Sequence, residues 1–155
     1  MVKTLKIVLV SIIAVFVMSG LSLSADDHRV DPSALPKSAK TFIANYYAGT
    51  KIKKCEVDQS TQSYEVKLSD GTEIEFNALG ACIDISAPDD KVISSNLAKA
   101  LLPEAASKTL TERGLLHSVK EIEYSGQGYK VEVKHKNIDD IYFNTIGQLG
   151  KITRH

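Results

Sequence analysis

Two cysteines and four histidines are the residues of this chain best suited to nucleophilic or metal chemistry. Cys82 and His135 could form a nucleophile and its base, but no third residue stands at a spacing that would orient the imidazole. The other histidines, His28, His117 and His155, have no Cys, His or carboxylate at a metal-ligand spacing. The sequence therefore predicts no catalytic residue, no metal site and no cofactor.

A group of acidic residues offers a second kind of chemistry. Glu73 and Glu75, with Glu65 on the preceding strand, could act as a general acid and a general base. Lys54 and Lys67 fall on neighbouring expected strands, and cross-strand ion pairs with these carboxylates are the simpler interpretation. We therefore expect a charged sheet surface here and no enzyme active site.

Cys55 and Cys82 would be disulfide candidates in an exported protein. They fall on the first and fourth strands of one expected meander, which places them roughly 14 Å apart, whereas a disulfide tolerates about 7 Å between Cα atoms. Strand alternation also assigns the two side chains to opposite faces. We therefore expect no internal disulfide, with Cys55 in the core and Cys82 half-exposed.

The first 24 residues have the pattern of a secretory signal peptide. Lys3 and Lys6 give a basic start, residues 7–17 are almost wholly apolar, and Ser22 and Ser24 supply the small residues before a cleavage site. A membrane-spanning helix would need about 20 apolar residues, more than this run offers. The sequence predicts a periplasmic or secreted protein that has no membrane anchor after cleavage.

The charge balance excludes one class of partner. Cleavage after Ser24 removes Lys3 and Lys6, which leaves 17 of the 19 basic residues against 19 acidic ones. A protein that binds nucleic acid by releasing counterions needs a basic face. The glycines are scattered at turns and form no phosphate-binding loop. We therefore expect no nucleic-acid partner.

The mature chain is an internal duplication. A shift of 67 residues aligns the Leu-Pro pair at 35–36 with the one at 102–103, and the Phe-Asn-x-x-Gly segment at 76–80 with the one at 143–147. The middle strand needs a shift of 65, as loops of variable length allow. Matches at both ends and in the middle predict two copies of one module.

Each copy predicts one helix followed by four antiparallel strands. In the first copy, Ala39, Phe42, Ile43 and Tyr46 form one apolar helix stripe, and Gly49 ends the helix. The expected strands are 52–58, 64–69, 72–77 and 81–86 in the first copy, and 119–124, 129–135, 140–144 and 148–153 in the second. The fold class is α+β: two tandem α-β-β-β-β repeats, with helices packed on one face of an antiparallel meander and the other face open.

The expected boundaries follow from the duplication. They are 1–24 for the signal peptide, 25–34 for a flexible N-terminus, 35–87 for repeat 1, 88–101 for a linker and 102–155 for repeat 2. Ser94 or Ser95 could cap a short helix in the linker. Because each half is small, we expect the two repeats to share a core. Two arrangements stay open, one continuous sheet of eight strands or two separate sheets.

The first copy also carries a family pattern. It consists of the Leu-Pro pair near the helix start, YEVKL at 64–68, DGTEIEFN at 70–77 and Gly80. This pattern resembles the PepSY-like family related to the β-lactamase-inhibitor-like fold, over nearly all of the mature chain. The resemblance implies an exported protein of two such units, and the inhibitor that names the fold grips its target enzyme with the open sheet face. Relatives commonly have Trp after the Asn-x-x-Gly turn, where this chain has Cys82.

The open sheet face is the surface that we expect to bind a partner, another protein or a peptide. The candidate partner-binding residues are Lys67, Glu73, Glu75, Cys82, Lys130, Glu132, Tyr142 and Leu149. Tyr142 and Leu149 are its apolar members, and interfaces often place such anchors inside a polar rim. The expected function is a non-enzymatic exported binding module, with inhibition of a secreted or periplasmic enzyme as the form that the resemblance implies. The alternative is an envelope sensor of a small ligand or metal ion, with Asp89, Asp90 and His117 at its site.

Overall fold

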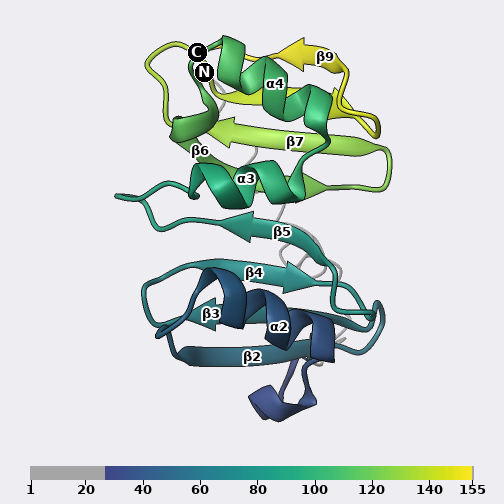
Figure 1. Cartoon of the computed structure of the whole chain (residues 1–155). Helices are drawn as coiled ribbons and strands as arrows, with labels where there is room; N and C mark the ends of the chain where they lie inside the picture. Colours follow the sequence, from purple (N-terminus) through teal and green to yellow (C-terminus); the bar gives the residue numbers. More distant parts are fainter. Residues whose placement is uncertain (1–26, 155) are drawn as a thin grey trace, which may run out of the picture.

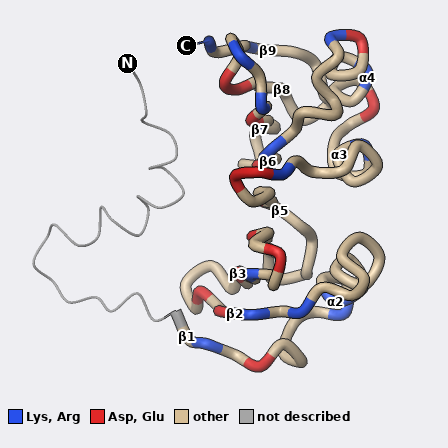
Figure 2. Tube along the Cα trace, turned by 90° about the vertical axis from the view of Figure 1, so that its left-hand side faces the viewer, with Lys and Arg blue, Asp and Glu red and all other residues tan. Residues whose placement is uncertain are grey.

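The computed structural model describes residues 27–154, so the signal peptide expected at 1–24 lies outside the described range. The described chain forms one nine-stranded antiparallel sheet in which each strand pairs with its neighbours in sequence order. Three α-helices lie on one face of this sheet (Figure 1). Turned by 90°, the molecule shows the helices on one side and the strands on the other, and no described element covers the second face (Figure 2).

The elements repeat in the order that the sequence predicts. The strands are β1 (Asp27–Arg29), β2 (Ile52–Asp58), β3 (Ser63–Leu68), β4 (Glu73–Phe76), β5 (Cys82–Ser86), β6 (Val119–Tyr124), β7 (Gly128–Val133), β8 (Asp140–Asn144) and β9 (Leu149–Ile152). The helices are α2 (Lys37–Tyr46), α3 (Ser95–Leu101) and α4 (Glu104–Glu112), with short 3-10 turns η2 (Pro32–Ala34) and η3 (Leu116–Ser118). The α+β class with a meander sheet, helices on one face and an open second face is confirmed.

Residues 27–34, within the N-terminal segment expected at 25–34, form a short strand and a 3-10 turn. The β1 strand pairs antiparallel with β2. Asp31 then caps η2, because its carboxylate accepts a hydrogen bond from the backbone N–H of Ser33 at 2.8 Å. A strand of three residues is too short to show a period of two, so no pattern in the sequence indicates it.

The helices begin where the sequence places a suitable cap. Pro36 and Pro103 directly precede α2 and α4, where the missing N–H of proline leaves no helical hydrogen bond unmade. In the linker, the Ser94 hydroxyl accepts a hydrogen bond from the backbone N–H of Leu97 at 3.2 Å and starts α3. The short helix expected between the repeats is therefore present.

The Asn-x-x-Gly segment of each repeat is a turn that packs under the start of its helix. The Asn77 side-chain oxygen accepts two backbone N–H hydrogen bonds at 3.0 Å each. Gly80 has a φ of +78°, and a Cβ there would lie 2.7 Å from Pro36 Cβ and 2.9 Å from the backbone nitrogen of Ala39. Gly147 approaches the start of α4 in the same way. The Leu-Pro and Asn-x-x-Gly motifs are thus the two sides of one contact.

The two repeats share one sheet and one core. β5 of the first repeat pairs antiparallel with β6 of the second, and Ile85 lies opposite Ile122 on the helix side. Phe76 and Phe143, the equivalent aromatic residues of the two repeats, are 0% and 3% exposed. The question left open by the sequence is therefore settled in favour of a continuous sheet, which β1 extends from eight strands to nine.

Candidate functional site

The open face presents two rows of mostly charged side chains that run across the strands. In register order, the first row is Arg29, Glu56, Glu65, Glu75, Asp84, Glu123, Lys130, Tyr142 and Lys151. The second row is Lys54, Lys67, Glu73, Ser86, Glu121, Glu132 and Asp140. Residues directly opposite each other on paired strands point to the same face. The first row therefore brings five acidic residues together on adjacent strands, from β2 to β6.

Most of the predicted partner-binding residues lie in these two rows. Those on the open face are Lys67, Glu73, Glu75, Lys130, Glu132 and Tyr142. Cys82 and Leu149 instead lie opposite the helix-side residues Phe76 and Phe143, just beyond register irregularities in β4–β5 and β8–β9. An extra residue at such an irregularity shifts the alternation by one. The structure therefore corrects the assignment of Cys82 and Leu149 to the open face.

The two cysteines are free thiols, in agreement with the separation expected between their strands. Cys55 is buried, and Cys82 packs against the helix-side core. Burial raises the pKa of the Cys82 thiol to about 12, which leaves almost no thiolate near neutral pH. Cys82 lies on β5 and His135 beyond the end of β7, with β6 between them. These positions give no support to a nucleophile-base pair.

Of the cross-strand ion pairs that the sequence predicts for Lys54 and Lys67, the pair between Lys67 and Glu73 is present, and Lys54 pairs with Glu56 on its own strand. The Lys67 ammonium lies 2.5 Å from Glu73 Oε1, and the Lys54 ammonium lies 2.6 Å from Glu56 Oε2. Exposed ion pairs of this kind contribute about 0–1 kcal/mol each. The pair with Lys67 accounts for Glu73 without any acid-base role.

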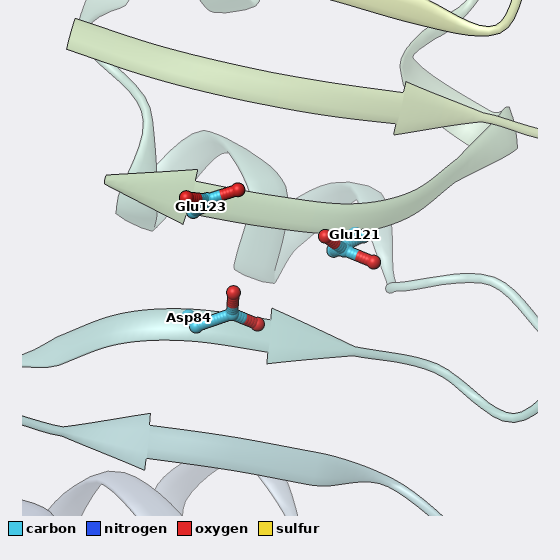
Figure 3. A group of neighbouring side chains, drawn as sticks. All are labelled: Asp84, Glu121 and Glu123. Atoms are coloured by element: carbon cyan, nitrogen blue, oxygen red, sulfur yellow. The ribbon is translucent and has the colours of Figure 1, made fainter. Parts of the chain in front are cut away.

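The middle of the open face is different, because its acidic residues come from both repeats and are partly buried. One carboxylate oxygen each from Asp84 on β5 and from Glu121 and Glu123 on β6 lies within 4.8 Å of the other two (Figure 3). We call these three residues the junction carboxylates. Asp84 is 8% exposed. Burial, and then the charges of Glu121 and Glu123, raise the pKa of Asp84 to about 8.

Lys130 on β7 is the cation that faces this group. Its ammonium lies 3.5 Å from Glu121 Oε1, 4.0 Å from Glu123 Oε2 and 3.8 Å from Asp140 Oδ1. Burial lowers the pKa of Lys130, but these three carboxylates outweigh it and the pKa is raised overall. Burial also raises the pKa of Glu121. One ammonium is thus shared among three carboxylates, and its charge offsets only part of the rise in the pKa of Asp84.

Tyr142 lies at the end of the first row, next to Lys130. The Lys151 ammonium lies 5.4 Å from the centre of its ring, and the Tyr142 hydroxyl donates a hydrogen bond to Asp140 Oδ2 at 3.5 Å. The ring is therefore held on the open face, where the sequence places it, between a lysine and an aspartate.

The junction carboxylates cannot be recognised as a group from the sequence alone. Asp84 ends the first repeat, and Glu121 follows the linker, so only the pairing of β5 with β6 brings them together. Within residues 27–154, the junction carboxylates are the group of three or more potential ligands that meets the spacing for a metal ion. Asp89, Asp90 and His117 are not such a group, and Asp89 pairs with Lys120 at 3.7 Å instead.

Three solved bacterial proteins share this fold. A "putative periplasmic protein of unknown function" from Bacteroides vulgatus is 29% identical over 82% of this chain and 98% of its own, with a TM-score of 0.67. A second "putative periplasmic protein" from the same organism is 22% identical over 84% of this chain and 98% of its own, with a TM-score of 0.70. A "putative calcium-regulated periplasmic protein" from Bacteroides thetaiotaomicron is 23% identical over 83% of this chain and 97% of its own, with a TM-score of 0.67. The last two likenesses concern the fold alone.

The relatives agree with the expected location. The protein that is 29% identical is described as periplasmic, in agreement with the periplasmic or secreted location expected for this chain. Among residues 27–154, no helix combines the length and the apolar character needed to cross a membrane. No curated protein sequence matches the chain.

A family pattern matches the chain twice, over residues 21–84 and 62–151. The two matches overlap at 62–84, and the second continues from there through the second repeat. Two matches to one family support the duplication, and they confirm the resemblance carried by the YEVKL and DGTEIEFN segments. The description of this family names no catalytic activity. The chain therefore belongs to the family described as putative β-lactamase-inhibitor-like, PepSY-like.

Proposed function

We propose that the protein is a non-enzymatic binding module of the periplasm that recognises another protein or a peptide through its open sheet face. The observation that carries this proposal is a wide sheet that has helices on one face (Figure 2) and two rows of mostly charged residues, aligned by the strand register, on the other. Such a face offers a broad, rigid surface whose side chains are fixed by the strand register. Among the candidate residues that the structure describes, no nucleophile lies beside both a base and a group that would orient that base.

The charge of the face indicates the chemistry of the partner. The run of acidic residues from Glu56 to Glu123 favours a partner surface that carries lysines and arginines. Tyr142 supplies an aromatic anchor in the same row, on the far side of Lys130 from that run. Inhibition of a secreted or periplasmic enzyme is the most specific form of the proposal, and membership of a β-lactamase-inhibitor-like family supports it.

The test compares substitutions on the two faces of the sheet. Envelope proteins captured by the immobilised mature protein are identified, and their affinities are then measured with purified components. We expect Glu75→Lys and Tyr142→Ala to weaken the partner at least ~10-fold without lowering the melting temperature. Glu112→Lys makes the same charge change at the exposed end of α4, and we expect it to have no effect.

Two outcomes would contradict the proposal. A partner that Glu112→Lys releases and Glu75→Lys retains would bind the helix side. Unfolding by Tyr142→Ala would mean that this side chain is part of the core and no part of a binding face.

A further inference from the structure

The junction carboxylates have fewer partners than their burial requires. Asp84 is 8% exposed, and its Oδ2 has no hydrogen-bond partner. The buried Oε1 of Glu121 also lacks a hydrogen bond and has the Lys130 ammonium at 3.5 Å instead. Buried carboxylates are normally hydrogen-bonded, paired or bound to a metal ion. The burial of Asp84 beside two further carboxylates therefore points to a missing positive charge.

The direction of the side chains agrees with that interpretation. The Asp84 carboxyl points from β5 toward β6, into the space between the Glu121 and Glu123 carboxyls (Figure 3). On the other side of Asp84, the residue opposite it in register is Glu75, another acid. Like charges directly opposite each other on a sheet are destabilising. The residue that the strand register places opposite Asp84 on β4 therefore does not compensate the charge of the Asp84 carboxylate.

The spacing of the oxygens fits one divalent cation. Ca²⁺ binds carboxylate oxygens at about 2.3–2.6 Å, so two ligands on opposite sides of the ion lie roughly 5 Å apart. The three junction oxygens, which lie within 4.8 Å of one another, meet this limit without any backbone movement. Mg²⁺ binds at about 2.1 Å in a strict octahedron, so its ligands lie at most about 4.2 Å apart. Because these carboxylates are positioned by two paired strands, the more tolerant coordination of Ca²⁺ suits them better than the strict octahedron of Mg²⁺.

We propose that Asp84, Glu121 and Glu123 bind a single hard divalent cation at the junction of the two repeats, with Ca²⁺ preferred over Mg²⁺. Water reaching the site from the open side of the sheet completes the coordination, since three carboxylates supply fewer than the 6–8 oxygens that Ca²⁺ takes. The proposal does not rest on the recognition of a protein or peptide, because the site is complete within one chain.

Lys130 is the internal competitor of the cation. Its ammonium lies 3.5 Å from Glu121 and 4.0 Å from Glu123, the same carboxylates that would hold the ion. Asp140, which is 9% exposed and 3.8 Å away, retains the ammonium when the cation binds. Removal of the lysine charge should therefore strengthen cation binding, whereas removal of a junction carboxylate should weaken it. A structural role of the same residues would not produce these opposite signs.

The test uses the mature full-length protein and the metal alone. The protein is stripped with EDTA, exchanged into metal-free buffer at pH 8 and titrated with CaCl₂ and MgCl₂ by isothermal titration calorimetry. We expect one Ca²⁺ per chain with a dissociation constant of about 1 mM or lower, and Mg²⁺ binding at least ~10-fold weaker. Asp84→Asn and Glu123→Gln should each weaken Ca²⁺ at least ~10-fold, and Lys130→Met should strengthen it ~3-fold or more. Glu73→Gln, at an exposed acid of the same face, is the matched control and should leave the affinity unchanged.

Several results would overturn the proposal. One is the absence of both a binding heat and a shift in melting temperature with Ca²⁺ up to about 10 mM. Another is equal weakening by Glu123→Gln and Glu73→Gln, which would mean diffuse attraction of counterions to an acidic surface. Glu123 is partly exposed, so its variant keeps the test valid if Asp84→Asn fails to fold. No partner protein is involved in this test. A failure to bind Ca²⁺ would therefore leave the proposed recognition of a protein or peptide untouched, and a failure of that recognition would leave the cation site untouched.

Discussion

Asp84 is the residue at which the electrostatics of the junction can be measured directly. The pKa of its carboxyl is raised from 3.8 to about 8, first by burial and then by Glu121, Glu123 and Glu75. An acid whose pKa is higher in the folded state binds its proton more tightly there than in the unfolded chain. Its contribution therefore favours folding fully below pH 4, declines as the pH rises, and is lost above about pH 8.

The size of the effect follows from the same shift. At pH 7 the unfolded carboxyl is ionised and the folded one is largely protonated, a difference of roughly three pKa units. This corresponds to an upper limit of about 4 kcal/mol, which movement of Lys130 and water toward the charge would reduce. We expect Asp84→Asn, which keeps the shape of the side chain and removes its charge, to stabilise the metal-free protein by about 2 kcal/mol at pH 7 and by almost nothing at pH 4.

The assay is urea unfolding followed by circular dichroism at several pH values between 4 and 8.5, with EDTA in every sample. For a protein of this size, about 2 kcal/mol moves the urea midpoint by roughly 1 M. Glu73→Gln, at an exposed carboxylate paired with Lys67, serves as the control and should change stability by less than ~0.5 kcal/mol throughout. A gain that is the same at pH 4 and pH 7 would refute the reasoning. A loss of stability at pH 7 would show that the ionised Asp84 carboxylate is already compensated in the native protein.

Two further predictions concern the packing of the first repeat. Gly80→Ala should destabilise the protein by ~2 kcal/mol more than Gly49→Ala in urea unfolding. Both glycines have positive φ, but only the Cβ at Gly80 would approach Pro36 and Ala39 within 3.0 Å, and equal losses would contradict the proposed contact. Both cysteine thiols should react with a disulfide reagent at pH 8 at least ~100-fold more slowly in the native than in the unfolded protein, because burial raises their pKa values. Rapid reaction of one native thiol would place Cys82 at the surface.

The alternation of apolar and polar residues was sufficient to predict most of the sheet. The strands at 52–58, 119–124 and 140–144 begin and end at the predicted residues, because apolar and polar residues alternate over most of each strand. The strands 52–58 and 119–124 interrupt that alternation only near their first residue, where each has a register irregularity. The errors at Cys82 and Leu149 have one cause. Ile83 and Gly150 are extra residues at the two register irregularities, and neither residue type marks such a site in the sequence.

The junction could not be predicted from the pattern within either repeat. Residue alternation places Asp84 and Glu123 on the open face, but it gives no information on which strand of one repeat meets which strand of the other. That pairing depends on the segment between β5 and β6, which contains α3 and α4. This segment leads the chain away from β5 after Ser86 and brings it back as β6 beside β5. The three carboxylates therefore become visible as a group only in the assembled fold.

A comparison of equivalent positions shows that two of the three junction carboxylates are particular to the junction, whereas Glu123 has the acidic equivalent Glu56 in the first repeat. The shift of 67 residues that relates the repeats makes Lys151 the equivalent of Asp84 and Lys54 the equivalent of Glu121. The module thus has lysines where its strands lie near the outer ends of the sheet, and carboxylates where the same positions meet in its middle. Lysines near sheet edges discourage pairing with other chains. Central strands are already paired on both sides and do not need this protection. A solvated face would be served equally well by lysines there. An Asp84 carboxyl buried opposite Glu123 is instead protonated in the metal-free protein, and a bound cation would compensate its charge in the ionised form.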